Sequence, residues 1–129
     1  MFPRFTLGRS KRLRHQRDFQ RVFATKRSAA DDRLVVYVAD NELSHSRLGI
    51  SISRRVGNAV LRNRLKRCLR EAFRTGQHEL PSAMDIVCVI RPGGDGTRAD
   101  FNLSLWKLVA KASRRRPRLY QSKPIRPRR

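Results

Sequence analysis

The sequence predicts an α+β fold, in which one small sheet packs against helices as a two-layer sandwich. Three short segments are rich in β-branched and other apolar residues, which is typical of strands. Three further segments repeat apolar residues every three or four positions, as helices with one buried face do. A chain of 129 residues has room for one domain with a modest core. We therefore expect a single domain over residues 1–112, with 1–8 flexible, and a disordered basic tail over 113–129.

The first helix is expected over residues 18–24, because Phe19, Val22 and Phe23 recur at helical spacing. The first strand follows over residues 34–39, a β-branched and aromatic run that is apolar on both faces.

The second strand is expected over residues 48–53, where large apolar side chains alternate with Gly49, Ser51 and Ser53. This alternation gives the strand one apolar face and one face of small polar residues. The third strand, over residues 86–90, is apolar throughout, as expected for the interior of a sheet.

The second helix is expected to begin after Asn58, a favourable N-cap, and to stop at Gly76. Its apolar positions, among them Leu61, Leu65 and Cys68, fall on one side. The third helix has Asp100 as its expected cap and repeats apolar residues at the same spacing. Its apolar residues include Phe101, Leu105, Leu108 and Ala112, and Trp106 beside them is expected to serve packing.

The charge of the chain points to a polyanionic partner. Lys and Arg number 31 against 10 Asp and Glu, which gives a net charge of +21. Such an excess repels itself unless an anionic partner neutralises it, and nucleic acid or an anionic membrane surface would do so. The bases are mostly Arg, whose planar donors suit phosphates and bases, so nucleic acid is favoured over lipid.

Other classes are excluded by composition. No apolar run approaches the ~20 residues of a membrane span, and the first residues lack the apolar core of a secretory signal. Cys68 and Cys88 lie in apolar patterns and are expected to be buried free thiols. These features together predict a cytoplasmic protein.

The second helix separates into an apolar and a basic face. Glu71 is its only acid, and like charges such as Arg62, Lys66 and Arg70 follow one another at i, i+4. Solvated helix faces usually mix the two signs, because opposite charges at this spacing stabilise a helix and like charges destabilise it. The pattern therefore favours phosphate contact with strongly salt-dependent affinity over a merely solvated face.

The segment from Arg47 to Arg67 resembles the signature of the bacterial ribonuclease P protein family. It contains a strand, two bases, Gly57-Asn58-Ala59, an Arg62-Asn63-Arg64 helix and a closing Lys-Arg. The resemblance extends upstream through residues 12–13 and 18–23 and covers roughly residues 9–112.

The resemblance implies a small mixed sheet with three helices, of the type found in the second domain of a ribosomal small-subunit protein. The basic helix would join two parallel strands by a left-handed crossover, against the usual right-handed rule. Family members are subunits of a ribonucleoprotein that removes the 5′ leader of precursor tRNA, and its RNA subunit carries the chemistry. The implied partners are thus ribonuclease P RNA and precursor tRNA, with no membrane and no obligate protein partner.

The resemblance also assigns residues to two surfaces. The basic helix would face the catalytic RNA through Arg54, Arg55, Asn58, Arg62, Asn63, Arg64, Lys66 and Arg67, to which we add Arg70 on the same face. The leader would lie in a cleft between the first helix and the sheet, where Phe19, Phe23 and Tyr37 match the family's aromatics.

Aromatic platforms suit a leader, because they stack on unpaired bases with little sequence preference. Arg17 and Arg21 are expected to hold its phosphates, and Ser51 and Ser53 to line the same floor. From spacing alone, however, two Phe at i, i+4 are more often a core stripe, so Phe23 is expected to serve both purposes.

No catalytic constellation or metal-binding motif is visible in the sequence, and no cofactor is expected to bind the polypeptide. Mg²⁺ is expected to act at RNA phosphates, as the resemblance implies. A ribosomal or general RNA-chaperone protein remains the alternative from composition. A stand-alone protein nuclease would need several converging carboxylates, which ten scattered acids do not provide.

Overall fold

The computed structural model describes residues 11–80, 83–93 and 97–114. These residues form one four-stranded mixed sheet and three α-helices, which confirms the predicted α+β class. The elements run in the order α1 (Gln16–Ala24), β1 (Ser28–Ala30), β2 (Leu34–Asp40), β3 (Arg47–Ile52), η2 (Arg54–Val56), α2 (Ala59–Gly76), η3 (Gln77–Glu79), β4 (Met84–Ile90) and α3 (Arg98–Ser113). The segment 1–8 and nearly all of the expected tail lie outside the described residues. The tail was expected from residue 113, but Ser113 still belongs to α3.

The sheet has the strand order β1-β2-β4-β3. The pairs β1–β2 and β2–β4 are antiparallel, whereas β3 and β4 are parallel. The chain passes through α2 between these two parallel strands, which is the crossover that the resemblance implied. Its left hand stays a prediction.

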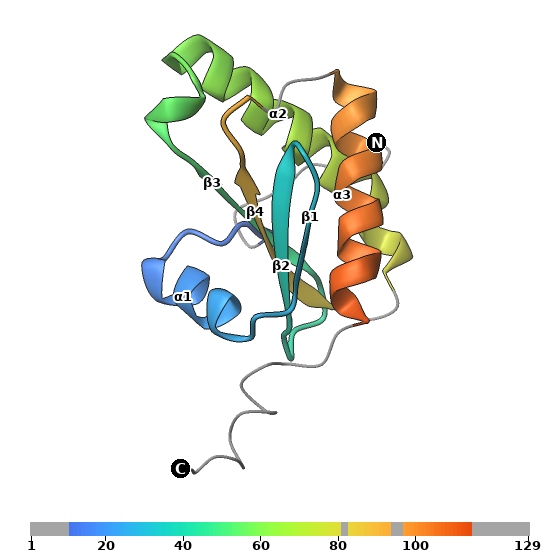
Figure 1. Ribbon diagram of the computed structural model, residues 1–129. Helices are drawn as coiled ribbons and strands as arrows, with labels where there is room; N and C mark the ends of the chain where they lie inside the picture. The colour runs from blue at the N-terminus through green and yellow to red at the C-terminus, as the bar shows by residue number, and fades with distance from the viewer. Residues whose placement is uncertain (1–10, 81–82, 94–96, 115–129) are drawn as a thin grey trace, which may run out of the picture.

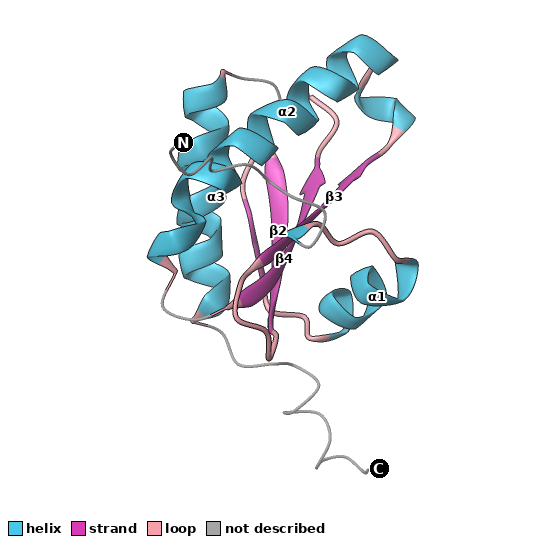
Figure 2. Cartoon of the chain, turned by 180° about the vertical axis from the view of Figure 1, so that it is seen from behind, coloured by secondary structure: helices cyan, strands magenta, loops and turns pink. Residues whose placement is uncertain are grey.

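Helices lie on both faces of the sheet (Figures 1 and 2). Alternate strand residues, such as Val36, Ile86 and Cys88, point into the main core beneath α2 and α3. Their neighbours Tyr37 and Val87 point to the other face, where α1 covers a smaller cluster. The sheet and the layer of α2 and α3 match the two layers expected, and α1 lies in addition on the other face of the sheet.

The packing of α2 on α3 depends on Gly76 and Trp106. The Trp106 ring stacks on Phe73 at 6.2 Å between centroids, and its Nε1 donates a hydrogen bond to the Ala72 carbonyl at 3.2 Å. Trp106 thus serves packing, as predicted. Gly76 does not end the helix through a left-handed backbone, since its φ is −113°. An added Cβ there would lie 2.6 Å from the Trp106 ring, so the glycine makes room for the indole.

The bounds or caps of several other elements differ from expectation. Strand β1 was not predicted, because Ser28-Ala29-Ala30 is short and lacks β-branched residues. The N-cap of α3 is Thr97 rather than Asp100, which instead closes a capping box by accepting from the Thr97 amide at 2.8 Å. Helix α1 begins at Gln16, two residues before the expected start.

The segment before α1 lies along the outer edge of β3. Arg12 forms an isolated parallel bridge with Leu48, and the Leu13 amide donates to the Leu48 carbonyl at 2.8 Å. Leu13 itself is buried beneath α1. This pairing brings the basic N-terminal segment next to α2.

Candidate nucleic-acid interface

Short polar side chains fix the start of α2. Asn58 is the N-cap, as predicted, and its Oδ1 accepts a hydrogen bond from the Leu61 amide at 2.9 Å. Ser53 lies beyond the end of β3, and its Oγ accepts from the Arg55 amide at 3.3 Å. Ser53 therefore caps η2 instead of lying in the sheet floor, where it was expected.

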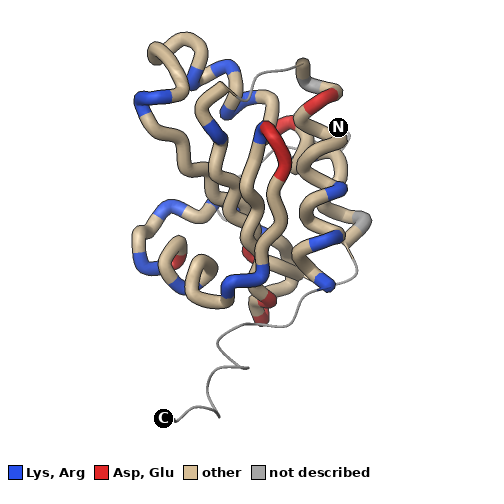
Figure 3. Tube along the Cα trace, viewed as in Figure 1, with Lys and Arg blue, Asp and Glu red and all other residues tan. Residues whose placement is uncertain are grey.

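The residues predicted to face RNA lie together on η2 and α2, where Lys and Arg recur along the chain (Figure 3). The opposite side of α2 is buried through Leu65, Cys68, Leu69, Ala72 and Phe73, which confirms the two-faced helix. Most of the basic set is exposed and the rest is half-buried. The exposed members are Arg54, Arg55, Asn58, Asn63, Arg64 and Arg67, and the half-buried ones are Arg62, Lys66 and Arg70.

Two arginines of α2 have partners within their own segment. Arg62 donates from Nε to the Gly57 carbonyl at 3.1 Å, which holds its guanidinium over the first turn. Arg74 pairs with Glu71 at 2.7 Å, so the helix's one acid compensates a base outside the predicted set. The remaining positive charge of α2 is not balanced by acids on the helix.

A small pocket of about 140 Å³ lies between α2 and the segment before α1. Four bases line it, namely Arg12, Arg14, Lys66 and Arg70, together with three apolar residues and no acid. Burial lowers the pKa of Arg70, and the neighbouring charge of Arg12 lowers it further. Bases gathered in this way favour an anionic group such as a phosphate.

Arg12 and Arg14 were not among the predicted site residues. The sequence did show a basic N-terminal block, but their closeness to α2 depends on the pairing with β3. Neither helical periodicity nor strand alternation could reveal that pairing.

Aromatic rings form a continuous group on the α1 side of the sheet. The Phe19 and Phe23 centroids lie 6.4 Å apart, and Phe23 meets Tyr37 edge-on at 4.8 Å. All three are half-buried against a small cluster that contains Val22 and Val87. The two Phe rings therefore pack against the core, as their spacing suggested, and are also partly exposed, as leader binding would require.

The next row of the same sheet face is half-exposed. It consists of Val35, Val89 and Ser51, which are paired across β2, β4 and β3. Ser51 thus lies on the same sheet face as the rings, and its contact with a leader stays a prediction. This row lies beside the rings on the same sheet face and is half-exposed like them.

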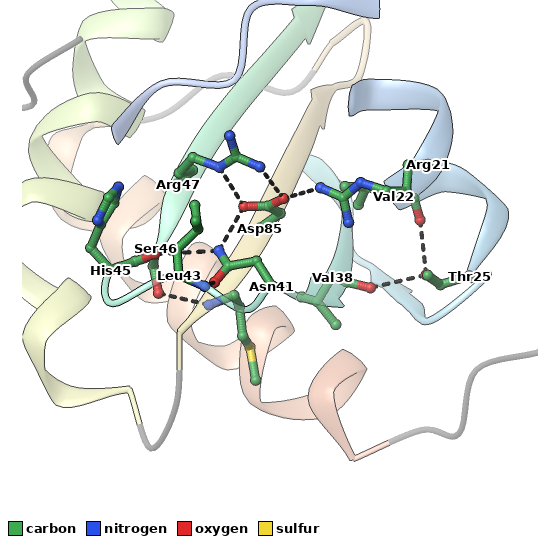
Figure 4. Close-up of polar contacts among 11 residues, drawn as sticks. Arg21, Val22, Thr25, Val38, Asn41, Leu43, His45, Ser46, Arg47 and Asp85 are labelled. Carbon is green, nitrogen blue, oxygen red and sulfur yellow. Dashed lines mark hydrogen bonds and ion pairs between the residues drawn. The ribbon is translucent and has the colours of Figure 1, made fainter. Parts of the chain in front are cut away.

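Arg21 and Arg17 do not share one setting. Arg17 is exposed on α1, but Arg21 reaches to Asp85 of β4 and forms an ion pair with it (Figure 4). Asp85 is fully buried and also accepts from Arg47 Nε and Nη2 at 2.8 and 2.7 Å, and from Asn41 Nδ2 at 2.8 Å. Burial acts to raise the pKa of Asp85, but its hydrogen bonds from Arg47, Asn41 and Arg21 outweigh this and lower it.

Among residues 11–80, 83–93 and 97–114, no three His, Cys, Asp or Glu gather as metal ligands. No helix in that part of the chain is long and apolar enough to span a membrane. Cys68 and Cys88 are free and buried, as predicted.

An α+β fold with a mixed sheet, a helix of six bases and one acid on one face, and half-exposed aromatic rings on the other defines a small protein of the RNA-binding class. The sequence model of the family described as Ribonuclease P matches residues 7–113. The chain belongs to this family, whose curated members are protein components of ribonuclease P.

Individual relatives agree with this assignment. The ribonuclease P protein component of Lachnoclostridium phytofermentans is 44% identical over 87 residues, which cover 67% of this chain and 75% of that protein. The one from Staphylococcus aureus is 41% identical over 101 residues, which cover 77% and 86%.

Solved structures of the family have the same fold. The Staphylococcus aureus protein gives a TM-score of 0.68 at 39% identity and covers 78% of this chain and 93% of that chain. The Thermotoga maritima protein gives a TM-score of 0.64 at 34% identity and covers 74% and 92%.

Proposed function

We propose that this protein component binds the catalytic RNA of ribonuclease P through η2 and α2, and the 5′ leader of precursor tRNA through the α1 face. The RNA then hydrolyses the phosphodiester bond with Mg²⁺, and the polypeptide supplies binding and charge screening. The observation that carries the proposal is the basic face of α2, which continues to Arg12 and Arg14 around one pocket.

Phosphate contact accounts for the basic face. Each base that neutralises a phosphate releases a counterion, so binding gains free energy that falls steeply as salt rises. The half-buried Lys66 and Arg70 lie beside other bases and gain most from an anionic partner. Binding thereby reduces the repulsion among the bases of the protein and the repulsion among the phosphates of the folded RNA.

Stacking accounts for the α1 face. Half-exposed aromatic rings contribute ~1–3 kcal/mol per stacked base and accept any base. The row of Val35, Val89 and Ser51 adds half-exposed strand side chains beside the rings. A single strand of variable sequence is the ligand that such a surface suits.

No cluster of acidic residues suited to metal-assisted hydrolysis lies among the described residues of the polypeptide. Asp85 is the one buried carboxylate among the described residues, and two arginines and Asn41 already donate hydrogen bonds to it. It is therefore held as an ion-pair partner and not as a general base. We assign the hydrolysis to the RNA.

The first experiment is cleavage of precursor tRNA by a bacterial ribonuclease P RNA at low Mg²⁺, with and without the polypeptide. We expect the polypeptide to restore cleavage, because its bases replace screening by Mg²⁺. A polypeptide-only control should be inactive. No restoration by folded protein with a matched RNA would favour a ribosomal or chaperone role, and cleavage by the polypeptide alone would reveal a protein active site.

The RNA-facing role is tested by replacing Arg62 and Arg67 with Ala. We expect weaker binding to the catalytic RNA and a salt dependence reduced by about one for each lost phosphate contact. Replacing Lys107 and Lys111 of α3 with Ala is the matched control, since it also removes two exposed bases and leaves α2 unchanged. An unchanged salt dependence in the α2 variant would refute the assigned role.

The leader-binding role is tested with Phe19→Ala. We expect lower affinity for leader-bearing tRNA and unchanged affinity for mature tRNA, because only the leader would stack on the ring. Equal losses for both RNAs would show that Phe19 acts only through the fold.

A further inference from the structure

Helix α1 is held on the sheet by few contacts. Val22 is its one fully buried residue, and Phe19 and Phe23 are half-buried. Thr25 at its end donates from Oγ1 to the Val38 carbonyl at 2.9 Å. Arg21 of α1 forms an ion pair with Asp85 of β4, and Asp18 of α1 also attracts Arg47 of β3.

Arg21 and the aromatic side chains flank this buried contact on opposite sides. Arg21 precedes Val22 by one residue and Phe23 follows it by one, so each lies about 100° round the helix from Val22. A helix that rests on one buried side chain can roll about its axis. The Arg21 ion pair lies on the side of the helix opposite Phe23, where it is placed to restrain such a roll.

Asp85 is a fixed point for this restraint. Its carboxylate is 0% exposed, although the Arg21 side chain is 44% exposed. Arg47 of β3 donates to both of its oxygens and Asn41 donates to Oδ1, so the carboxylate is held by residues outside α1 (Figure 4). Asp85 also lies on the same sheet face as Val87, one row from the rings.

We propose that Arg21 and Asp85 are positioning residues, which set the roll of α1 and hence the orientation of Phe19 and Phe23 toward a single-stranded leader. This inference rests on the proposed leader-binding function. It gives Arg21 a different role from the one predicted from sequence, namely an internal ion pair in place of a phosphate contact.

The test is Arg21→Ala, which leaves Asp85 paired with Arg47 and Asn41 and so keeps the sheet intact. Affinity for leader-bearing tRNA should fall about tenfold, which corresponds to loss of one charged hydrogen bond. The salt dependence should stay unchanged, and amide hydrogen exchange in α1 should accelerate. Arg21→Lys should recover part of the affinity, and Gln20→Ala, on the exposed side of α1, should behave as the wild type.

Two results would overturn the inference. A salt dependence reduced by about 0.7 with unchanged exchange would show that Arg21 contacts a phosphate directly. Unchanged affinity and exchange would show that the ion pair does not position α1.

Failure of the proposed function gives a different result. In that case wild type and Phe19→Ala would bind precursor and mature tRNA alike. The exchange rates of α1 in Arg21→Ala would then decide alone whether the ion pair restrains the helix.

Discussion

Gly49 lies directly beneath the ring of Phe19. An added Cβ would be 2.7 Å from Phe19 Cζ and 3.0 Å from Leu13 Cβ, which is closer than side chains pack. The ring can swing away at its far end, but Leu13 is buried and has less freedom. The absence of a side chain at Gly49 thus fixes how closely α1 approaches β3.

Gly49→Ala should therefore lower the free energy of unfolding by about 1 kcal/mol through overpacking. Chemical denaturation measures this change, and Ser51→Ala on the same face of β3 is the control that should change little. Unaltered stability of Gly49→Ala would show that Leu13 and Phe19 shift freely.

Cys88 is a buried thiol at the centre of β4. Burial raises its pKa to about 12, so the reactive thiolate is nearly absent at neutral pH. We expect a thiol reagent to leave Cys88 unmodified in the native protein and to modify it on unfolding, as measured by mass spectrometry. Modification of native Cys88 as fast as that of a free thiol would contradict its burial.

For single residues, the sequence predicts which face of an element a side chain lies on better than it predicts which distant residue the side chain contacts. Arg67 and Asn58 lie where helical periodicity and capping preference placed them, because both depend on neighbours within one turn. Arg21 lies 64 residues from Asp85 along the chain, and nothing local to either reveals the pair. Ser53 was misassigned because alternation does not show where a strand ends.

The helices illustrate a second limit at the scale of elements. The apolar stripe of α2 was predictable, but the reason for its final glycine was not, since Trp106 approaches from α3. Strand β1 escaped prediction because its three residues are held by backbone pairing with β2 rather than by strand-forming side chains. Elements with strong periodicity follow from sequence, and those made by a partner do not.

Gly76→Ala measures the packing between α2 and α3. In an isolated helix this change stabilises by ~0.5–1 kcal/mol, because glycine loses more backbone freedom. Here the new Cβ meets the indole at 2.6 Å, so we expect a net loss of about 1–2 kcal/mol in the free energy of unfolding.

Urea unfolding followed by circular dichroism gives this value without depending on the indole. In a Trp106→Phe background the smaller ring should remove much of the penalty, which a double-mutant comparison detects. The same penalty in both backgrounds would assign the effect to something other than the indole.

For the whole molecule, the basic helix α2 carries six bases and one acid, and several carboxylates elsewhere are held by hydrogen bonds of the fold. The pKa of Asp31 is lowered although burial acts to raise it, because backbone amides bond to its carboxylate. Amide and hydroxyl bonds from Thr97 lower the pKa of Asp100. Asp85, with its arginines, shares this direction.

A carboxyl with a lowered pKa in the fold stabilises the protein above its unfolded pKa of about 4, and this contribution is lost as pH falls. Because the unfolded pKa of these groups is ~4, we expect them to change the free energy of unfolding little between pH 5 and pH 7. Below about pH 4 the free energy of unfolding should decline as the carboxylates become protonated. Denaturation at a series of pH values measures the slope, and Asp85→Asn should flatten it. An equally steep decline in that variant would show that Asp85 takes no part.

The fold class and the basic helix of the whole molecule were predictable, because both follow from patterns within about twenty residues. The joining of distant basic segments was not. Arg12 and Arg14 meet Lys66 and Arg70 only after the N-terminal segment has paired with β3. The extent of the basic surface is thus a property of the folded chain.

That same pairing bears on how copies of this protein behave at high concentration. β3 is the last strand of the sheet, and an unoccupied strand edge is a template on which a second chain can polymerise. The Leu13 amide already donates a hydrogen bond to the Leu48 carbonyl at this edge, and the positive charges of Arg12 and Arg14 beside it would repel a second copy. The segment before α1 thereby opposes edge-to-edge aggregation through β3, and removal of residues 1–13 should promote it.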